Sequence, residues 1–127
     1  DVDDQLVKQV MFSPESGLAA TKSLLDQKTK PDGIFAVNDE VCFGAMKIIQ
    51  EKNYKIPEEI ALVGFDDIPL AAFAPIALSS VSRQSKKIGE QSAHLFLSKM
   101  NGIHQHQQFT LEPELIIRES SQRNHCS

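Results

Sequence analysis

The chain has 127 residues, of which 41% are hydrophobic and 24% are charged, an ordinary composition for one globular domain. Its formal charge is −4 with a pI near 5.5, and Lys and Arg never cluster beyond pairs, so this chain alone is not expected to bind nucleic acid. It has neither a leader of signal-peptide type nor the ~20 consecutive apolar residues that a transmembrane helix needs.

The cysteines and histidines predict neither a disulfide nor a metal site. Cys42 and Cys126 lie far apart in the sequence, which indicates reduced thiols and a cytoplasmic protein. His104 and His106 form an "HQH" pair, but no carboxylate or cysteine lies nearby to complete a metal site. We therefore expect a solvated loop there, and no metal or other cofactor.

Residues 14–27 have the pattern of an amphipathic helix. Ser13 offers an N-cap, and Pro14 suits the first helical position. Side chains of one face then recur at helical spacing: Leu18, Thr21, Leu24 and Leu25. After the turn "TKPDG", the short apolar run 34–37 predicts a strand that is covered on both faces.

A second helix and a second strand follow. Asn38 or Asp39 can cap the helix, whose apolar positions recur at three and four residues. The apolar run 60–65 then predicts the next strand. A helix that joins two strands within so short a stretch predicts a right-handed crossover and therefore parallel pairing.

Beyond residue 67 the pattern is less regular. Residues 68–77 are apolar but hold two prolines, which excludes a long helix. We expect a strand over 78–82, a helix over 85–102 and extended pieces over 109–120, with a polar tail over 121–127. The predicted fold class is α/β, with a parallel sheet flanked by helices.

Polar side chains follow both strands of the strand–helix–strand unit. Asn38 and Asp39 come after the first strand, and Asp66 and Asp67 after the second. Ligands of open parallel sheets bind outside the carboxyl ends of the strands, and an amide beside a carboxylate suits hydroxyl-rich ligands such as sugars or nucleosides. Adjacent aspartates in an extended segment point in opposite directions, so we expect at most one of the two to contact a given ligand and the other to cap the following turn. On residue types alone, all four are equally well explained as cap and turn residues.

An enzyme is the weaker class. The chain has no Ser-His-Asp or Cys-His arrangement, no glycine-rich phosphate loop and no "HExxH" pattern. A metal-dependent enzyme that uses Asp66 and Asp67 remains an alternative, although metal-assisted hydrolysis needs several converging ligands.

The segments "FAVND", "IPEEIALVGFDD", "LSSV" and "ELIIRES" resemble, in order and spacing, the LacI/GalR family of bacterial transcription regulators. The resemblance runs from about Phe12 to Ser120 and lies in the effector-binding domain, which is similar to periplasmic sugar-binding proteins. It implies an incomplete C-terminal lobe of the periplasmic-binding-protein-like (type I) fold over residues 1–120, with the helix at 85–102 belonging to the other lobe. A periplasmic sugar receptor of a transporter is the alternative with the same fold.

The resemblance also implies ligand contacts. Asn38 matches a position that contacts effector hydroxyls, Asp66 a carboxylate that binds a sugar or purine, and Phe12 an aromatic residue that packs on the ligand ring. Arg83 departs from the family, because many members carry glutamine there. Either the effector is acidic or phosphorylated, or Arg83 turns to a neighbouring carboxylate, and we favour the second explanation.

The implied protein is a cytoplasmic repressor without enzymatic activity or membrane partners. An effector, expected to be a sugar, would bind between lobes and control DNA binding by a helix-turn-helix that this chain lacks. A homodimer is expected, because Phe43, Leu70 and Phe73 resemble the family's dimerisation surface, although a core role for the phenylalanines is an equal alternative. In this chain the helix at 85–102 would leave one stripe without cover: Ile88, Ser92, Leu95, Phe96 and Met100.

Overall fold

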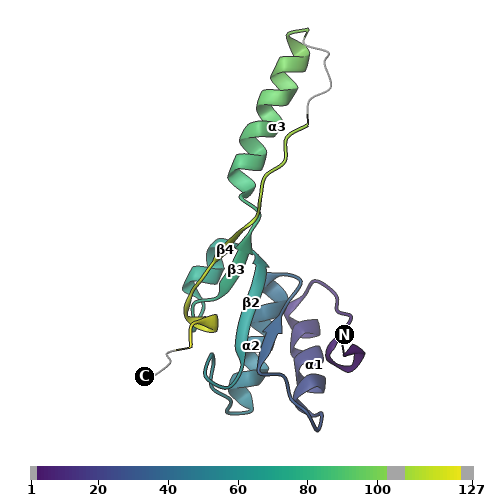
Figure 1. Ribbon diagram of the computed structural model, residues 1–127, viewed down its shortest axis with the longest axis vertical. Coiled ribbons are helices and arrows are strands. Elements are labelled where there is room, and N and C mark those ends of the chain that lie inside the picture. Colours follow the sequence, from purple (N-terminus) through teal and green to yellow (C-terminus); the bar gives the residue numbers. More distant parts are fainter. Residues whose placement is uncertain (1–2, 103–107, 124–127) are drawn as a thin grey trace.

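The computed structural model describes residues 3–102 and 108–123, so His104, His106 and Cys126 lie outside the described residues. Its centre is a four-stranded sheet of order β1-β2-β3-β4 (Figure 1). The strands are β1 (Gly33–Phe35), β2 (Ala61–Asp66), β3 (Ser79–Ser82) and β4 (Glu114–Ile116). The first three strands are parallel, as predicted, and β4 returns antiparallel to β3.

Three α-helices and three short 3-10 helices complete the described part of the chain. They are α1 (Pro14–Leu25), α2 (Asp39–Glu51), α3 (Ser85–Met100), η1 (Asp4–Leu6), η2 (Pro69–Phe73) and η3 (Glu119–Ser121). Each predicted helix is present, although α1 and α3 each end two residues earlier than predicted. Ser13 caps α1 by accepting a hydrogen bond from the Ser16 N–H at 3.3 Å, with Pro14 at the first helical position.

The helices α1 and α2 touch through glycines. A Cβ added to Gly17 would collide with the Val41 carbonyl, and one added to Gly44 would collide with the Pro14 carbonyl. Because the colliding atoms are backbone, neither helix can yield without moving as a whole. Side chains of α2 and β2 then form the centre of the core, where Ile49 and Leu62 are fully buried.

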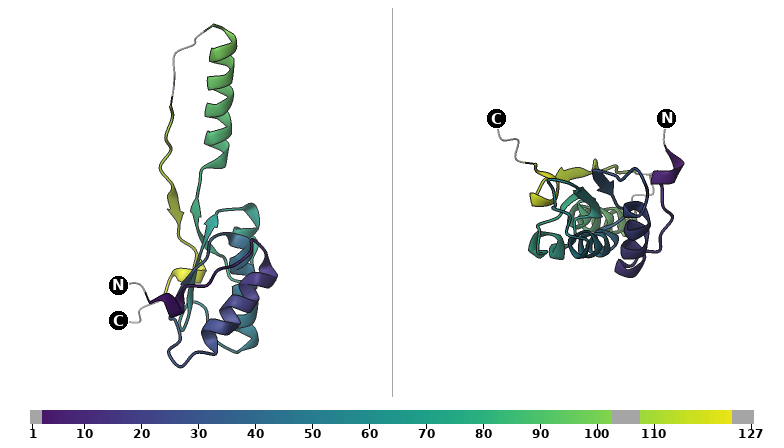
Figure 2. Two further views of the ribbon diagram at one scale, coloured as in Figure 1. Left: turned by 90° about the vertical axis from the view of Figure 1, so that its right-hand side faces the viewer. Right: turned by 90° about the horizontal axis from the view of Figure 1, so that it is seen from below.

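Both helices lie on one face of the sheet, and the opposite face is open (Figure 2). The predicted burial of both faces of residues 34–37 is therefore wrong for this chain: Phe35 is 65% exposed and Val37 46%. In β4, at the other edge of the sheet, Leu115 is also exposed. The apolar residues therefore predicted a strand correctly, but no segment among the described residues packs against its second face.

The helix α3 projects away from the body, beside the segment that leads back to β4 (Figures 1 and 2). None of its residues is buried, and the predicted apolar stripe is largely open, with Phe96 64% and Met100 69% exposed. Among the described residues, no helix is both long and apolar enough to span a bilayer.

Candidate functional site

The loops after β1 and β2 carry the polar residues that the sequence singled out. Phe35 pairs with Val63 in the parallel register, and Asn38 and Asp66 each follow three residues later. Asn38, in the loop after β1, and Asp66, the last residue of β2, therefore lie at the same end of the sheet, the carboxyl end at which open α/β sheets bind ligands.

Asn38 is the N-cap of α2. Its Oδ1 accepts a hydrogen bond from the Val41 N–H at 2.9 Å, which is the cap role that the sequence left open. The Nδ2 group of the same amide takes no part in that bond and can still donate. Capping and ligand binding therefore do not compete for one atom.

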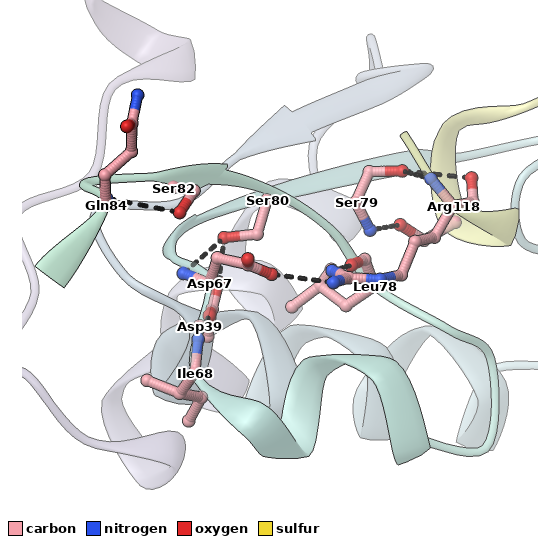
Figure 3. Close-up of polar contacts among 10 residues, drawn as sticks. Asp39, Asp67, Ile68, Leu78, Ser79, Ser80, Ser82, Gln84 and Arg118 are labelled. Carbon is pink, nitrogen blue, oxygen red and sulfur yellow. Dashed lines mark hydrogen bonds and ion pairs between the residues drawn. The ribbon is translucent and has the colours of Figure 1, made fainter. Parts of the chain in front are cut away.

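Asp39 is the buried link between three segments, with 1% of its surface exposed. Its Oδ1 accepts a hydrogen bond from Ser80 Oγ at 2.6 Å, and its Oδ2 accepts one from the Ile68 N–H at 2.8 Å (Figure 3). Ser80 Oγ in turn accepts a hydrogen bond from the Asp67 N–H at 3.0 Å. One carboxylate thus ties the start of α2 to β3 and to the loop after β2.

Burial raises the pKa of the Asp39 carboxyl, and the hydrogen bonds from Ser80 and Ile68 oppose that rise. Gly64 makes room for this carboxylate, because a Cβ at that position would collide with Asp39 Oδ1 and press on Leu78. The sequence pattern indicates only a cap or turn role for Asp39 and does not reveal this buried link. The glycine in "VGFDD" was the available signal.

Asp66 and Asp67 both have positive φ, at 105° and 52°, a region that residues other than glycine rarely adopt. They pair with different arginines: Asp66 Oδ1 lies 2.8 Å from Arg83 Nε, and Asp67 Oδ1 lies 2.8 Å from Arg118 Nη2. Strained backbone at consecutive residues is typical of binding and catalytic sites, where surrounding contacts hold it in place.

The two ion pairs differ in their surroundings. The side chains of Asp67 and Arg118 are each 20% exposed, and Arg118 also donates from Nη1 to the Leu78 carbonyl at 2.7 Å (Figure 3). Arg83 is 54% exposed and its partner Asp66 25%. The first pair therefore clamps β2, β3 and β4 together, whereas the second faces solvent. No local pattern in the sequence could have paired Asp67 with Arg118, because 51 residues separate them.

The remaining predicted site residues are largely exposed, and several of them border cavities. Phe12 is 70% exposed and precedes α1, which begins at the end of the sheet where β1 and β2 finish (Figure 1). Leu70 and Phe73 of η2 are 56% and 82% exposed, and with Phe43 they border a cavity of about 390 Å³. Arg83 borders a separate cavity of about 500 Å³ between α3 and residues 109–113.

The described part of the chain offers neither a metal-binding cluster nor a reactive cysteine. Within residues 3–102 and 108–123, no three His, Cys, Asp or Glu side chains are grouped to hold a metal ion. Cys42 is buried, and burial raises the pKa of its thiol to about 12, so it is not a nucleophile near neutral pH.

Comparison with known proteins assigns the chain to a family. The periplasmic binding protein-like domain family matches residues 4–121. The chain is 29% identical over 123 residues to the HTH-type transcriptional repressor PurR of Haemophilus influenzae (strain PittEE), which covers 94% of this chain and 37% of PurR. It is 37% identical over 113 residues to the lactose operon repressor of Rhizobium radiobacter, covering 89% of this chain and 100% of that protein.

A solved structure, the transcriptional regulator CelR–cellobiose complex, matches with a TM-score of 0.85 and 30% identity, over 95% of this chain and 37% of that chain. The chain thus spans little more than a third of the length of the PurR proteins that it matches. These matches confirm the predicted family: the chain belongs to the periplasmic binding protein-like domain family, in the form found in LacI-type transcriptional regulators.

Proposed function

We propose that this chain is the effector-binding part of a LacI-type transcriptional repressor, and that its effector is a sugar or sugar-like small molecule. The carboxylate of Asp66 would accept hydrogen bonds from ligand hydroxyls, and Nδ2 of Asn38 would donate one. Phe12 would pack on the ligand ring. The protein would bind and release its effector without catalysing a reaction.

The observation that carries this proposal is the position of Asp66. It is the last residue of β2, at the same end of the sheet as the loop that carries Asn38, and its side chain remains 25% exposed despite strained backbone. A carboxylate held toward solvent beside a free amide donor suits a ligand whose hydroxyls both donate and accept. The relative solved with cellobiose, a sugar, supports this ligand class.

In the proposed mechanism the ligand binds between this lobe and a second lobe outside the chain, and it favours their closed arrangement. Closure would alter DNA binding by a helix-turn-helix segment that also lies outside the chain. Such coupling requires that the ligand have different affinities for the open and closed arrangements. A homodimer formed through Leu70 and Phe73 of η2 would carry the change to two DNA-binding heads.

The test is a thermal-shift and calorimetric screen of neutral and acidic monosaccharides and of cellobiose, with the protein expressed from its complete gene. At least one probe should bind, and Asp66→Ala should weaken it by at least about tenfold, or ~1.4 kcal/mol. Asp32→Ala is the matched control, because Asp32 precedes β1, at the opposite end of the sheet, with its side chain 90% exposed. Equal binding by the Asp66 and Asp32 variants would refute the assignment.

A further inference from the structure

Arg83 lies directly beside the proposed ligand anchor. Asp66 pairs with Ser82 in the β2–β3 register, and Arg83 is the next residue along the chain. Its Nε lies 2.8 Å from Asp66 Oδ1. The guanidinium therefore stands at the carboxyl ends of the strands, where the effector would bind, and not at a remote surface.

The Asp66–Arg83 pair does little for the fold. Ion pairs this exposed contribute little to stability, because solvent screens them and the side chains lose freedom. The neighbouring Asp67–Arg118 pair has the structural role, since Arg118 is mostly buried and also bonds the Leu78 carbonyl. Arg83 has no comparable second contact: among residues 3–102 and 108–123, its two Nη groups make no hydrogen bond or further ion pair.

The pair changes what the site can bind. A lone Asp66 would repel an anionic ligand, but Arg83 cancels that charge, and its side chain, 54% exposed at the edge of the cavity between α3 and residues 109–113, keeps its two Nη groups outside the pair. These groups form the fork that binds a carboxylate or phosphate through two parallel hydrogen bonds. Asp66 Oδ2 takes no part in the pair and remains available to a hydroxyl.

We propose that the effector carries an anionic group next to its hydroxyls, as a sugar acid or sugar phosphate does, and that Arg83 binds this group while Asp66 holds the guanidinium and accepts a hydroxyl. This inference rests on the proposed function, because it names the ligand class of the same site. It makes Arg83 the residue that determines specificity for charge.

The test uses calorimetry on the protein expressed from its complete gene, with matched probes: glucose and glucuronate, galactose and galacturonate, ribose and ribose phosphate. In at least one pair the acidic member should bind at least about tenfold more tightly than the neutral one. Uronates and the phosphate separate the two anionic groups. Arg83→Gln should weaken the acidic probe by at least about tenfold and change the neutral one less than about threefold.

Lys86→Gln is the matched control, since it removes one exposed positive charge from the first turn of α3 without touching Asp66. It should change either affinity by less than about threefold, because a nearby but uncontacted charge is screened. The melting temperature of Arg83→Gln should stay within about 2 °C of the parent, as expected for an exposed pair.

Four results would overturn the inference, and the first three separate it from the proposed function. If neutral sugars bind as tightly as their acidic counterparts and need Asp66, the inference fails and the proposed function stands. The inference also fails, and the proposed function stands, if Arg83→Gln keeps the preference for acidic over neutral probes. It fails in the same way if Arg83→Gln raises the affinity for neutral sugars, because Arg83 then merely competes with them for Asp66. If no probe of either kind binds, both fail.

Discussion

The substitution Ser80→Ala tests whether the buried hydroxyl of Ser80 holds the strand-end loops in place. Ser80 is fully buried, and its Oγ donates to Asp39 Oδ1 at 2.6 Å and accepts from the Asp67 N–H at 3.0 Å. The variant removes both bonds at once and leaves a buried carboxylate oxygen and a part-buried N–H without these partners.

The expected cost follows from those two bonds. A hydrogen bond to a charged acceptor contributes about 1.5–3 kcal/mol and a neutral one about 0.5–1.5 kcal/mol, so Ser80→Ala should lower the free energy of unfolding by about 2–4 kcal/mol. That is a large part of the ~5–15 kcal/mol that stabilises a typical domain. The melting temperature should fall by roughly 10 °C.

Urea unfolding followed by circular dichroism measures this loss, and hydrogen exchange locates it. The amides of Asp67 and Ile68 should exchange faster in the variant, because both are held through the Asp39–Ser80 link. Ser92→Ala is the matched control, since the exposed Ser92 hydroxyl bonds the Ile88 carbonyl within α3 and, among the residues that the structure describes, no other group. It should cost less than about 0.5 kcal/mol. If Ser80→Ala proves as stable as Ser92→Ala, the Ser80 hydroxyl does not hold the strand-end loops.

Three further predictions concern packing, pH and assembly. Gly64→Ala should destabilise the protein by about 1–3 kcal/mol in urea unfolding, because its methyl group meets the Asp39 carboxylate, whereas Gly89→Ala meets nothing and should cause no loss. The pKa of Asp39 is raised above 3.8 in the folded state, so deprotonation costs stability there. The free energy of unfolding of the parent, relative to that of Asp39→Asn, should therefore fall as the pH rises from about 4. A difference in unfolding free energy that stays constant with pH would contradict this. Phe73→Ser, at a side chain 82% exposed, should shift the complete protein from dimer toward monomer in light scattering without lowering its melting temperature, and an unchanged dimer would exclude Phe73 from the interface.

The helices and parallel strands were predictable because their signals are local. Ser13 and Asn38 cap helices as their sequence positions indicate, and the strand–helix–strand unit required parallel pairing. Exposure was less predictable. An apolar strand such as residues 34–37 is typical of a sheet covered on both faces, but pattern alone does not say whether the covering segment is present.

The location of the candidate site could be predicted from the sequence, but the hydrogen bonds and ion pairs of its residues could not. Adjacent strand ends could be inferred from the parallel unit, and these ends carry Asn38 and Asp66. The partners of the carboxylates could not, because Arg118 is distant in sequence from Asp67 and only the β3–β4 pairing brings it close. Burial of Asp39 was likewise hidden, since an aspartate at the start of a helix is most often an exposed cap residue.

A crystal structure of the complete protein with the tightest-binding sugar probe would show directly whether Asp66 holds the ligand. We expect a ligand hydroxyl within hydrogen-bond distance, about 2.5–3.0 Å, of the Asp66 carboxylate, with Asn38 Nδ2 directed at the same ligand. A ligand seated elsewhere, for example in the cavity between α3 and residues 109–113 with Asp66 still paired only to Arg83, would contradict it.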